Sequence, residues 1–440
     1  MYLTKKQAFV PFTLLCVIGI ICLFFGQNPI KIPDVPGLND GDTAWMLTAT
    51  AFVFLMTPGL AFFYGGMVNS KNVISTMLQS FVCMAVVTVI WLVVGFSLSF
   101  GTSIHGIIGD PSTFFLMNHV LDGKPWPLAP TIPLILFALF QMKFAIITPA
   151  LITGAFAERI RFSSYLLFIC FFILFIYCPL AHAIWHPDGF LAKLGVLDFA
   201  GGAVVHMSAG IAALVSAVYL KKRRELTHNP ARVNFILLGT GLLWVGWFGF
   251  NGGCSLAANT LAATAIATTA AASAAAACMW ITLEVIRGKK PSATGFCIGA
   301  VVGLATITPA AGYVSIPHAV VIGLMATFVS SIVVAWRERT SIDDTLDVFP
   351  CHGVGGIVGM ILAGVFANRA INSANTTGNG LFFGETKLFL VQTLAVIGIA
   401  IAIALMSYIL LKITDMITPL RVNKEEEAEG LDLSQHGERL

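Results

Sequence analysis

The chain has 440 residues, of which 57% are hydrophobic and only 11% are charged. Soluble globular domains are about 25% charged, so the composition excludes an ordinary soluble fold and predicts an all-α polytopic membrane protein. The net charge of +3 is too small to indicate a nucleic-acid partner. The nine cysteines form no CxxC pair and stand in apolar contexts, which is typical of buried packing residues rather than of disulfides or a metal site.

The N-terminal segment resembles a secretory signal. Lys5 and Lys6 precede an apolar run from about residue 8 to residue 26, and no clear small-residue cleavage site follows. We expect residues 1–26 to be a signal peptide or an N-terminal apolar anchor and residues 27–42 to be an extracytoplasmic linker. The membrane domain is then 43–413 and the cytoplasmic regulatory tail is 414–440. The polar tail fits a disordered segment and a docking element equally well.

Eleven apolar stretches follow the linker, each long enough to cross a bilayer as a helix. They lie at about 43–67, 73–100, 129–154, 163–184, 199–220, 232–251, 257–282, 292–311, 316–336, 349–367 and 385–413. The loops after odd-numbered spans hold 13 Lys and Arg residues and those after even-numbered spans hold 4. Because basic loops stay in the cytoplasm, the mature chain is predicted to begin outside and end inside.

Two histidines occupy corresponding spans. His206 follows Asp198 in span five, and His352 follows Asp347 in span ten. Their separation covers five spans, an odd number, so a duplicated five-span unit would be inverted in the membrane. Transporters built from inverted repeats place a site near the midplane between the halves. We therefore expect an inverted five-plus-five helix pseudo-repeat in which the two histidines meet.

Several roles are open for such a histidine pair. The side chains could be hydrogen-bonded core residues, haem ligands, ligands of another metal, or the lining of a polar path. No further ligand cluster accompanies them, whereas metal sites normally use three or four ligands. Burial favours neutral imidazole, which suits a small polar substrate better than a bare cation. Asp198 and Asp347 are both expected to cap the helices that follow them.

Aromatic residues gather near the predicted outer ends of the spans. Phe140 and Phe144 share one helix face because they stand four residues apart. Trp185 closes span four, and Phe250 lies at the end of span six. Such residues form interface belts or hold a cation on their ring faces. Lys143 is the one lysine at membrane depth, and it could snorkel outward, pair with an acid or sense charge.

At these residues the chain resembles the ammonium transporter family (Amt/Mep/Rh), and in particular its bacterial AmtB-like Amt branch. The resemblance covers about residues 42–438. Its motifs are Phe62-Phe-Tyr-Gly-Gly66, Ala157-Glu-Arg-Ile-Arg-Phe162, Asp198-Phe-Ala-Gly-Gly-Ala-Val-Val-His206, Gly246-Trp-Phe-Gly-Phe-Asn251, Asp347 through Gly356, and Glu-Gly-Leu-Asp and His-Gly-Glu in the tail.

The resemblance implies a non-enzymatic ammonium transporter with eleven helices, no cofactor and one pore in each subunit of a homotrimer. It implies that His206 and His352 line the pore, and that Phe144 and Phe250 form a gate. The implied outer recruitment site comprises Asp198, Trp185, Phe144 and Cys254. Cys254 stands where many members have serine, and a thiol is a weaker hydrogen-bonding group than a hydroxyl.

The same resemblance implies an inner-membrane location and a PII-type regulatory protein at the cytoplasmic face. Two other classes remain open from the sequence. An ammonium sensor would use the same site to signal through the tail, and a membrane haem protein would use the histidines as axial ligands.

Overall fold

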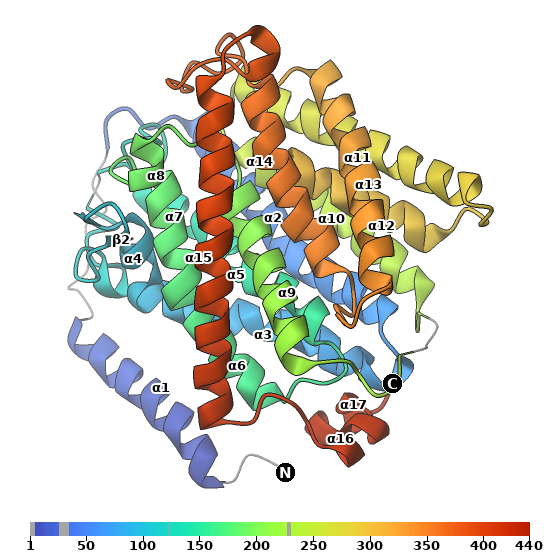
Figure 1. Ribbon diagram of the computed structural model, residues 1–440. Helices are drawn as coiled ribbons and strands as arrows, with labels where there is room; N and C mark the ends of the chain where they lie inside the picture. Colours follow the sequence, from blue (N-terminus) through green and yellow to red (C-terminus); the bar gives the residue numbers. More distant parts are fainter. Residues whose placement is uncertain (1–4, 26–34, 123, 227–229) are drawn as a thin grey trace.

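The protein folds as one bundle of membrane-length helices (Figure 1). Its structure, a computed structural model, describes residues 5–25, 35–122, 124–226 and 230–440. The predicted linker at 27–42 therefore lies partly outside the described residues. In the described chain, the only strands are β1 (Ser103–Ile104) and β2 (Ile108–Gly109), which pair antiparallel in a short hairpin.

The described helices fall into two groups. The longer ones are α1 (Lys5–Phe25), α2 (Asp40–Met67), α3 (Val73–Ile90), α5 (Leu134–Phe156), α6 (Phe162–Phe172), α9 (Ser208–Leu220), α10 (Val233–Gly253), α11 (Thr260–Ile286), α12 (Ala293–Ile307), α13 (Ile316–Glu338), α14 (Val354–Phe366) and α15 (Lys387–Ile417). The short ones are α4 (Phe96–Phe100), α7 (Cys178–Trp185), α8 (Phe190–Lys193), α16 (Lys424–Glu429), α17 (Leu431–His436) and the 3-10 turns η1 (Ser70–Asn72), η3 (Phe115–Met117) and η7 (Leu381–Phe383).

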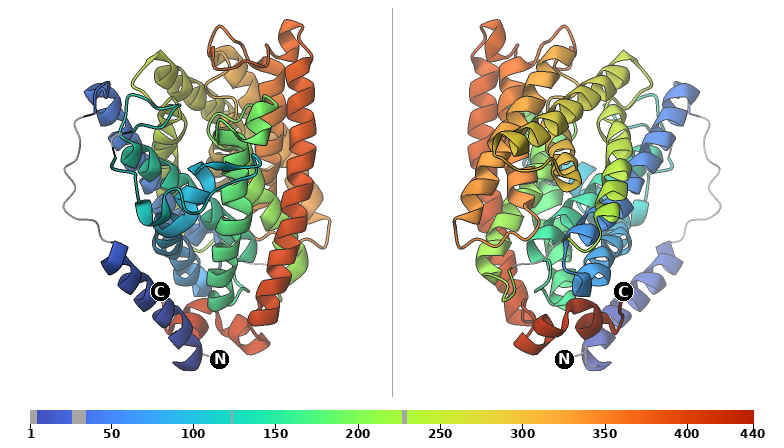
Figure 2. Two further views of the ribbon diagram at one scale, coloured as in Figure 1. Left: turned by 90° about the vertical axis from the view of Figure 1, so that its left-hand side faces the viewer. Right: turned by 90° about the vertical axis from the view of Figure 1, so that its right-hand side faces the viewer.

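Helical segments occupy all eleven predicted stretches. Of the described segments, ten are long and apolar enough to cross a membrane, and α12 is a shorter apolar helix of 15 residues packed against α10, α11 and α13. The helices vary in tilt, and α15 runs along nearly the whole height of the bundle (Figures 1 and 2). The prediction of an all-helical polytopic membrane fold is confirmed.

Four of the membrane segments contain a π-helical turn. These turns are η2 (Trp91–Gly95), η4 (Ile173–Tyr177), η5 (Gly202–Met207) and η6 (Phe349–Gly353). A π turn shifts the side-chain register of a helix and is frequent at functional sites. The turns η5 and η6 begin the segments that continue as α9 and α14, and they carry the two histidines singled out above.

These two segments approach each other through glycine. A Cβ atom at Gly210 of α9 would collide with the backbone of Gly353 at the end of η6. Small residues let membrane helices pack backbone to backbone. The close crossing lies next to His352 and four residues beyond His206, so it brings both histidines to one place.

The C-terminal tail is docked onto the bundle by hydrogen bonds. The Asp432 carboxylate accepts from the backbone amides of Ile74 and Ser75, at 3.1 and 2.7 Å, at the start of α3. The side-chain oxygen of Asn72 accepts from the amide of Leu431 at 2.7 Å. In Figure 1, α16 and α17 lie under one end of the bundle. Of the two expectations for the tail, the structure has the docking element.

Helix α1 stands beside the bundle (Figure 2), and many of its apolar side chains are exposed, such as Val10 and Phe24 at 69% and 83%. Such a surface suits a lipid environment. A signal peptide and a retained anchor both fit this arrangement.

Candidate functional site

His206 and His352 meet inside the bundle. Their Nδ1 atoms lie 3.3 Å apart, and their rings are nearly parallel with centroids 5.3 Å apart. Both side chains are almost completely buried, at 1% and 2% exposure. The predicted meeting of two residues that are 146 positions apart is found in the structure.

One ring nitrogen of this pair has no hydrogen-bond partner among the described residues. It is Nε2 of His206, which is buried. Buried polar atoms are usually satisfied, and an orphaned one inside a membrane bundle costs free energy unless a small polar molecule visits it. The pair therefore offers an unused hydrogen-bonding position.

Asp198 holds the start of the segment that carries His206. Its carboxylate accepts from the amides of Gly201, Gly202, Ala203 and Val204 at 2.6–3.1 Å. The predicted capping role is confirmed. Burial raises the pKa of this carboxyl and the four amides oppose that shift. The backbone carbonyl of Asp198 also accepts from the indole nitrogen of Trp185 at 3.0 Å, which fixes the ring at the site.

Capping by Asp347 is wrong for the second histidine segment. Its carboxylate lies 2.6 Å from Nε of Arg337, and its own backbone has a left-handed φ of 54°. The cap is supplied instead by Asp344, which accepts from the amide of Phe349 at 2.7 Å. Asp344 stands eight residues before His352, as Asp198 does before His206. This equal spacing is the signal in the sequence that could have identified Asp344 as the cap.

The predicted aromatic residues form a continuous column that leads to the histidines. The ring of Trp185 meets Phe144 edge to face at 6.0 Å, and Phe144 lies 4.2 Å from Phe250 between centroids. Phe250 in turn lies 6.1 Å from His206. Phe144 and Phe250 are fully buried, at 0% exposure, and they stand between Trp185 and His206 in this column.

Sequence reasoning missed Trp247 as a member of this site. Its ring stacks on His206 at 5.3 Å and 18°, and its indole nitrogen donates to Thr308 at 2.9 Å. Trp247 stands three residues before Phe250, so both share one face of α10. That spacing was the available signal, but the position of Trp247 near a predicted span end also fits an interface residue.

Cys254 ends this face of the site one turn beyond Phe250. Burial raises the pKa of the Cys254 thiol well above its usual range, and the negative charge of the Asp198 carboxylate adds to this shift. The thiol is therefore neutral. The neighbouring hydroxyl of Ser255 lies 2.8 and 2.7 Å from the carbonyls of Gly252 and Ala257. The proton of the Ser255 hydroxyl is therefore used within its own turn.

A comparison with known proteins identifies the family of this chain. Residues 44–439 match the family model described as the Ammonium Transporter Family. The chain belongs to the ammonium transporter family. It is 43% identical over 424 residues to an ammonium transporter of Aquifex aeolicus, with 96% of this chain and 98% of the relative covered.

Two solved structures are similar to this fold. The crystal structure of Saccharomyces cerevisiae Mep2 has a TM-score of 0.83 and 32% identity, with 89% of each chain covered. A protein titled "Sensor Amt Protein" has a TM-score of 0.82 and 29% identity, with 90% of this chain and 98% of that chain covered.

Lys143 contacts an aromatic ring at the surface of the bundle. Its ammonium group sits over the ring of Phe54 at 4.6 Å from the centroid, and Phe54 is 39% exposed at the bundle surface. Among the predicted alternatives, the structure favours snorkelling with a cation–π contact, since the described residues give it no acidic partner.

A buried ion network fixes the loop before η6. Arg223 lies 2.8 Å from Glu158 and 2.9 Å from Asp343, and Arg159 donates to the carbonyl of Asp343 and to Thr345. Burial alone would raise the pKa of Asp343, but the hydrogen bonds and charge of Arg223 hold it below the usual range. The network therefore positions the loop that supplies Asp344.

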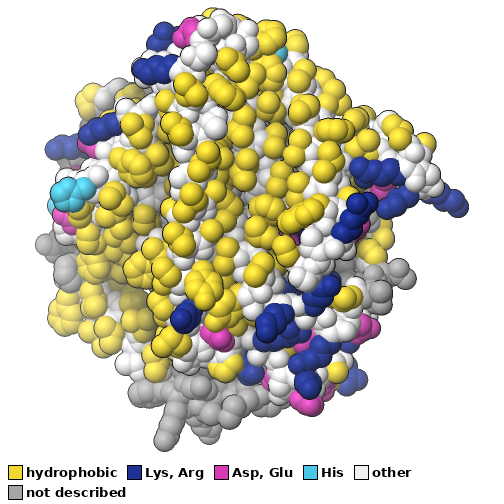
Figure 3. Space-filling model, viewed as in Figure 1, with side chains coloured by type: hydrophobic (Ala, Val, Ile, Leu, Met, Phe, Trp, Pro, Cys, Tyr) yellow, Lys and Arg dark blue, Asp and Glu magenta, His cyan; other side chains and the backbone are white. Residues whose placement is uncertain are grey.

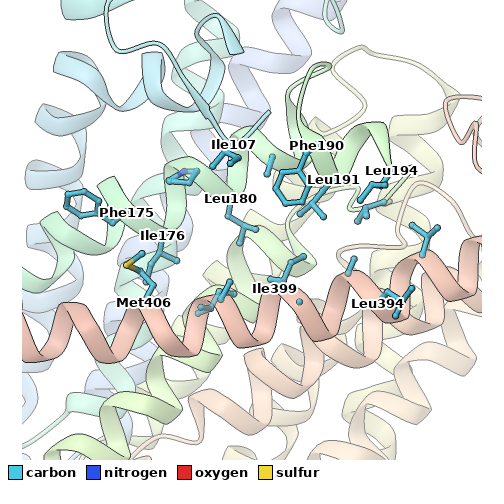
Figure 4. Close-up of a pocket in the computed structure, with 18 residues that line it drawn as sticks. Ile107, Phe175, Ile176, Leu180, Phe190, Leu191, Leu194, Leu394, Ile399 and Met406 are labelled. Atoms are coloured by element: carbon cyan, nitrogen blue, oxygen red, sulfur yellow. The ribbon is translucent and has the colours of Figure 1, made fainter. Parts of the chain in front are cut away.

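An apolar groove of about 540 Å³ lies elsewhere, between α7, α8 and α15 (Figure 4). Its walls include Phe175, Leu180, Phe190 and Met406. None of the predicted site residues lines this groove. Among the described residues, no group of three or more His, Cys, Asp and Glu residues could hold a metal ion.

Proposed function

We propose that this protein transports ammonium by recruiting the cation at Trp185, Phe144 and Cys254 and conducting ammonia past His206 and His352. The observation that carries the proposal is the ring column that runs from Trp185 to the buried histidine pair. Each step of the path then has a physical reason.

The outer end attracts a cation. Aromatic faces bind cations by about 0.5–2 kcal/mol, and Trp185 is held in place by its bond to Asp198. The Asp198 carboxylate is occupied by four backbone amides. It therefore acts as a support with a negative charge near the site rather than as a direct ligand.

The gate separates ammonium from potassium by desolvation. Phe144 and Phe250 offer no oxygen ligand, and an unpaired charge in such surroundings is costly. Ammonium can lose a proton near Asp198 and His206 and enter as neutral ammonia. Potassium has no neutral form, so the same barrier excludes it.

The two outer ring nitrogens of the histidine pair differ, because one accepts a hydrogen bond and the other donates one. Two neutral imidazoles can share only one proton between their Nδ1 atoms, which lie 3.3 Å apart. The ring that donates at Nδ1 then has a lone pair on Nε2, and the other ring has an N–H at Nε2. Ammonia both donates and accepts, and the released proton follows along the pair, which gives net charge transport.

We further propose eleven membrane spans arranged as an inverted five-plus-five repeat, with the N-terminal side of the domain outside and the tail inside. The distribution of basic loop residues supports the orientation. Two observations support the repeat. Both histidines lie within π turns, and each stands eight residues after the acid that caps its helical segment.

A homotrimer is proposed with one pore per subunit, and a PII-type protein is proposed to contact the cytoplasmic face where the tail docks. The Ala-rich helix α11, with exposed small residues, supports close packing between subunits. Cross-linking of the purified protein in membranes tests the trimer. Copurification with a PII-type protein, with and without residues 424–440, tests the second partner.

A sensor is the second candidate, because a similar structure carries that title and because the tail is docked rather than free. A haem site does not fit the histidine pair. Axial ligands stand on opposite faces of a macrocycle, and rings whose Nδ1 atoms lie 3.3 Å apart leave no room for one.

The deciding experiment records ammonium-evoked current in proteoliposomes together with tail accessibility to protease. A transporter gives current that depends on the ammonium gradient. Absence of current with an ammonium-dependent change in tail cleavage would establish the sensor instead.

A further inference from the structure

The chain leaves α7, directly after Trp185, through a histidine that the transport path does not use. His186 ends this helix, and it is only 7% exposed. On the face of the molecule shown in Figure 3, histidine side chains occupy only a small part of the surface. We infer that His186 is a positioning residue for Trp185, because its Nδ1 atom closes the turn that follows the tryptophan. The inference rests on the proposed function, since it concerns the affinity of the outer site for ammonium.

The hydrogen bonds of His186 define a tight turn. Its Nδ1 atom accepts from the backbone amide of Asp188 at 3.0 Å. Its backbone amide donates to the carbonyl of His182 at 3.1 Å, and its carbonyl accepts from the amide of Gly189 at 2.8 Å. A side-chain acceptor that binds the amide two residues later is the geometry of an Asx turn. The turn therefore requires a hydrogen-bond acceptor on the side chain of His186.

The partners of His182 and His186 determine which nitrogens carry protons. A backbone amide can only donate, so Nδ1 of His186 carries no proton and the neutral ring is protonated on Nε2. Nδ1 of His182 lies 3.0 Å from the carbonyl oxygen of Ser99, which can only accept, so that nitrogen carries a proton. In the neutral ring, Nε2 of His182 then accepts from the hydroxyl of Ser103 at 2.8 Å. The two rings stack with their centroids 4.3 Å apart.

The turn is anchored on both sides. On one side, the indole nitrogen of Trp185 donates to the carbonyl of Asp198. On the other side, the amide of Phe190 at the start of α8 donates to the carbonyl of Gly106, between β1 and β2, at 2.9 Å. Between these anchors, a Cβ atom at Gly189 would collide with backbone carbonyls of α7. The turn thus fixes the direction in which the chain leaves Trp185.

Acid is expected to open this turn. A proton on Nδ1 of His186 would point at the amide of Asp188, and two donors cannot share a hydrogen bond. The ring of His182 stacks on that of His186, and the ring of Trp126 meets it edge to face at 5.3 Å. The nearby charges are those of Asp188 and Lys193, which pair with each other at 2.8 Å. The carboxylate of Asp188 is therefore already engaged when the imidazole gains a proton.

The test uses two substitutions that separate the acceptor from the volume of the ring. His186→Asn keeps an acceptor for the amide of Asp188, because asparagine forms the same kind of turn, and it cannot be protonated. His186→Leu keeps an apolar side chain and has no acceptor. The control is His119→Asn, at an exposed histidine before α5. Ammonium-evoked current in proteoliposomes is recorded at external pH values from about 7.5 to about 4.5, which span the ordinary pKa of histidine.

The two substitutions are expected to differ in apparent affinity. At the highest pH, His186→Leu should raise the half-maximal ammonium concentration about 2- to 10-fold, because one hydrogen bond is lost, with little change in maximal current. His186→Asn should change that concentration by less than about twofold. As the pH falls, the parent and the control should lose affinity more steeply than His186→Asn. Parent-like affinity in His186→Leu, or one common pH profile for the parent and His186→Asn, would overturn the inference.

A second measurement does not depend on transport. Hydrogen exchange of the peptide that contains the Asp188 amide, corrected for the intrinsic effect of pH, should be faster in His186→Leu than in the parent and in His186→Asn. Equal exchange in all three proteins would overturn the inference even where ammonium evokes a current. Absence of current in the parent, with exchange as expected, would contradict the proposed function and not the turn.

Discussion

Asp198 and Asp344 perform the same structural task at two places far apart in the chain. Each lies eight residues before one histidine of the buried pair, and each carboxylate accepts a hydrogen bond from a backbone amide at the start of the helical segment that carries that histidine. The positions of His206 and His352 thus depend on two buried acids that contact neither ring.

Replacing these acids tests that dependence. Asp344→Ala should lower the stability by about 1–2 kcal/mol through loss of a helix cap. Asp198→Ala should lower the stability more, by about 2–4 kcal/mol, because four amides lose their acceptor instead of one. Thermal unfolding in detergent measures both, with the exposed Asp122→Ala as control. A smaller loss in Asp198→Ala than in Asp344→Ala would contradict the assignment.

Trp185 is expected to set the apparent affinity for ammonium. Trp185→Leu removes one cation–π face, so the ammonium concentration at half-maximal current should rise about 2- to 30-fold. The control is Trp336→Leu, which changes a 49% exposed tryptophan on α13. If both variants shift the half-maximal concentration equally, Trp185 is not part of the outer site.

A substitution of Cys254 is predicted to change the apparent affinity for ammonium in the opposite direction. Cys254→Ser replaces a weak hydrogen-bonding thiol with a hydroxyl, so the half-maximal ammonium concentration should fall about 2- to 10-fold. Cys278→Ser, at an exposed cysteine, should leave it unchanged. An unchanged or higher value in Cys254→Ser would show that the thiol does not face the recruited cation.

The buried network around Asp343 predicts a pH dependence. Arg223 holds the pKa of Asp343 below its usual value, so the pair stabilises the fold above that usual value and the contribution is lost as the pH falls through the lowered pKa. Asp343→Asn should cost about 3 kcal/mol near neutral pH. The difference from the parent should shrink as the pH falls below about 4.

Unfolding temperatures from pH 7 down to pH 3 provide the measurement for this pair. Asp188→Asn serves as the control, because Asp188 pairs with Lys193 on the surface, where both side chains are at least 60% exposed. A constant difference between Asp343→Asn and the parent over this range would contradict the electrostatic explanation.

Much of this organisation follows from the sequence. The apolar stretches predict the helices, and the occurrence of His206 and His352 in corresponding spans of an inverted repeat predicts their meeting. The cap at Asp344 was mistaken for Asp347 because both acids precede the same helix, and only the backbone shows that Asp347 turns toward Arg337. Trp247 was missed because its contact with His206 depends on how α10 packs. The docking of the tail depends on Asp432 reaching amides some 357 residues away, which composition does not reveal.

The central claim is that ammonia passes along the histidine pair, while potassium is excluded by the gate of Phe144 and Phe250. It is tested most directly by current in proteoliposomes with ammonium or potassium gradients, using the parent, His206→Ala, His352→Ala and the control His318→Ala, whose ring stacks on Phe366. We predict current with ammonium alone, reduced by about tenfold or more in both pore variants and unchanged in the control. Full and equally selective current in both pore variants would contradict the account.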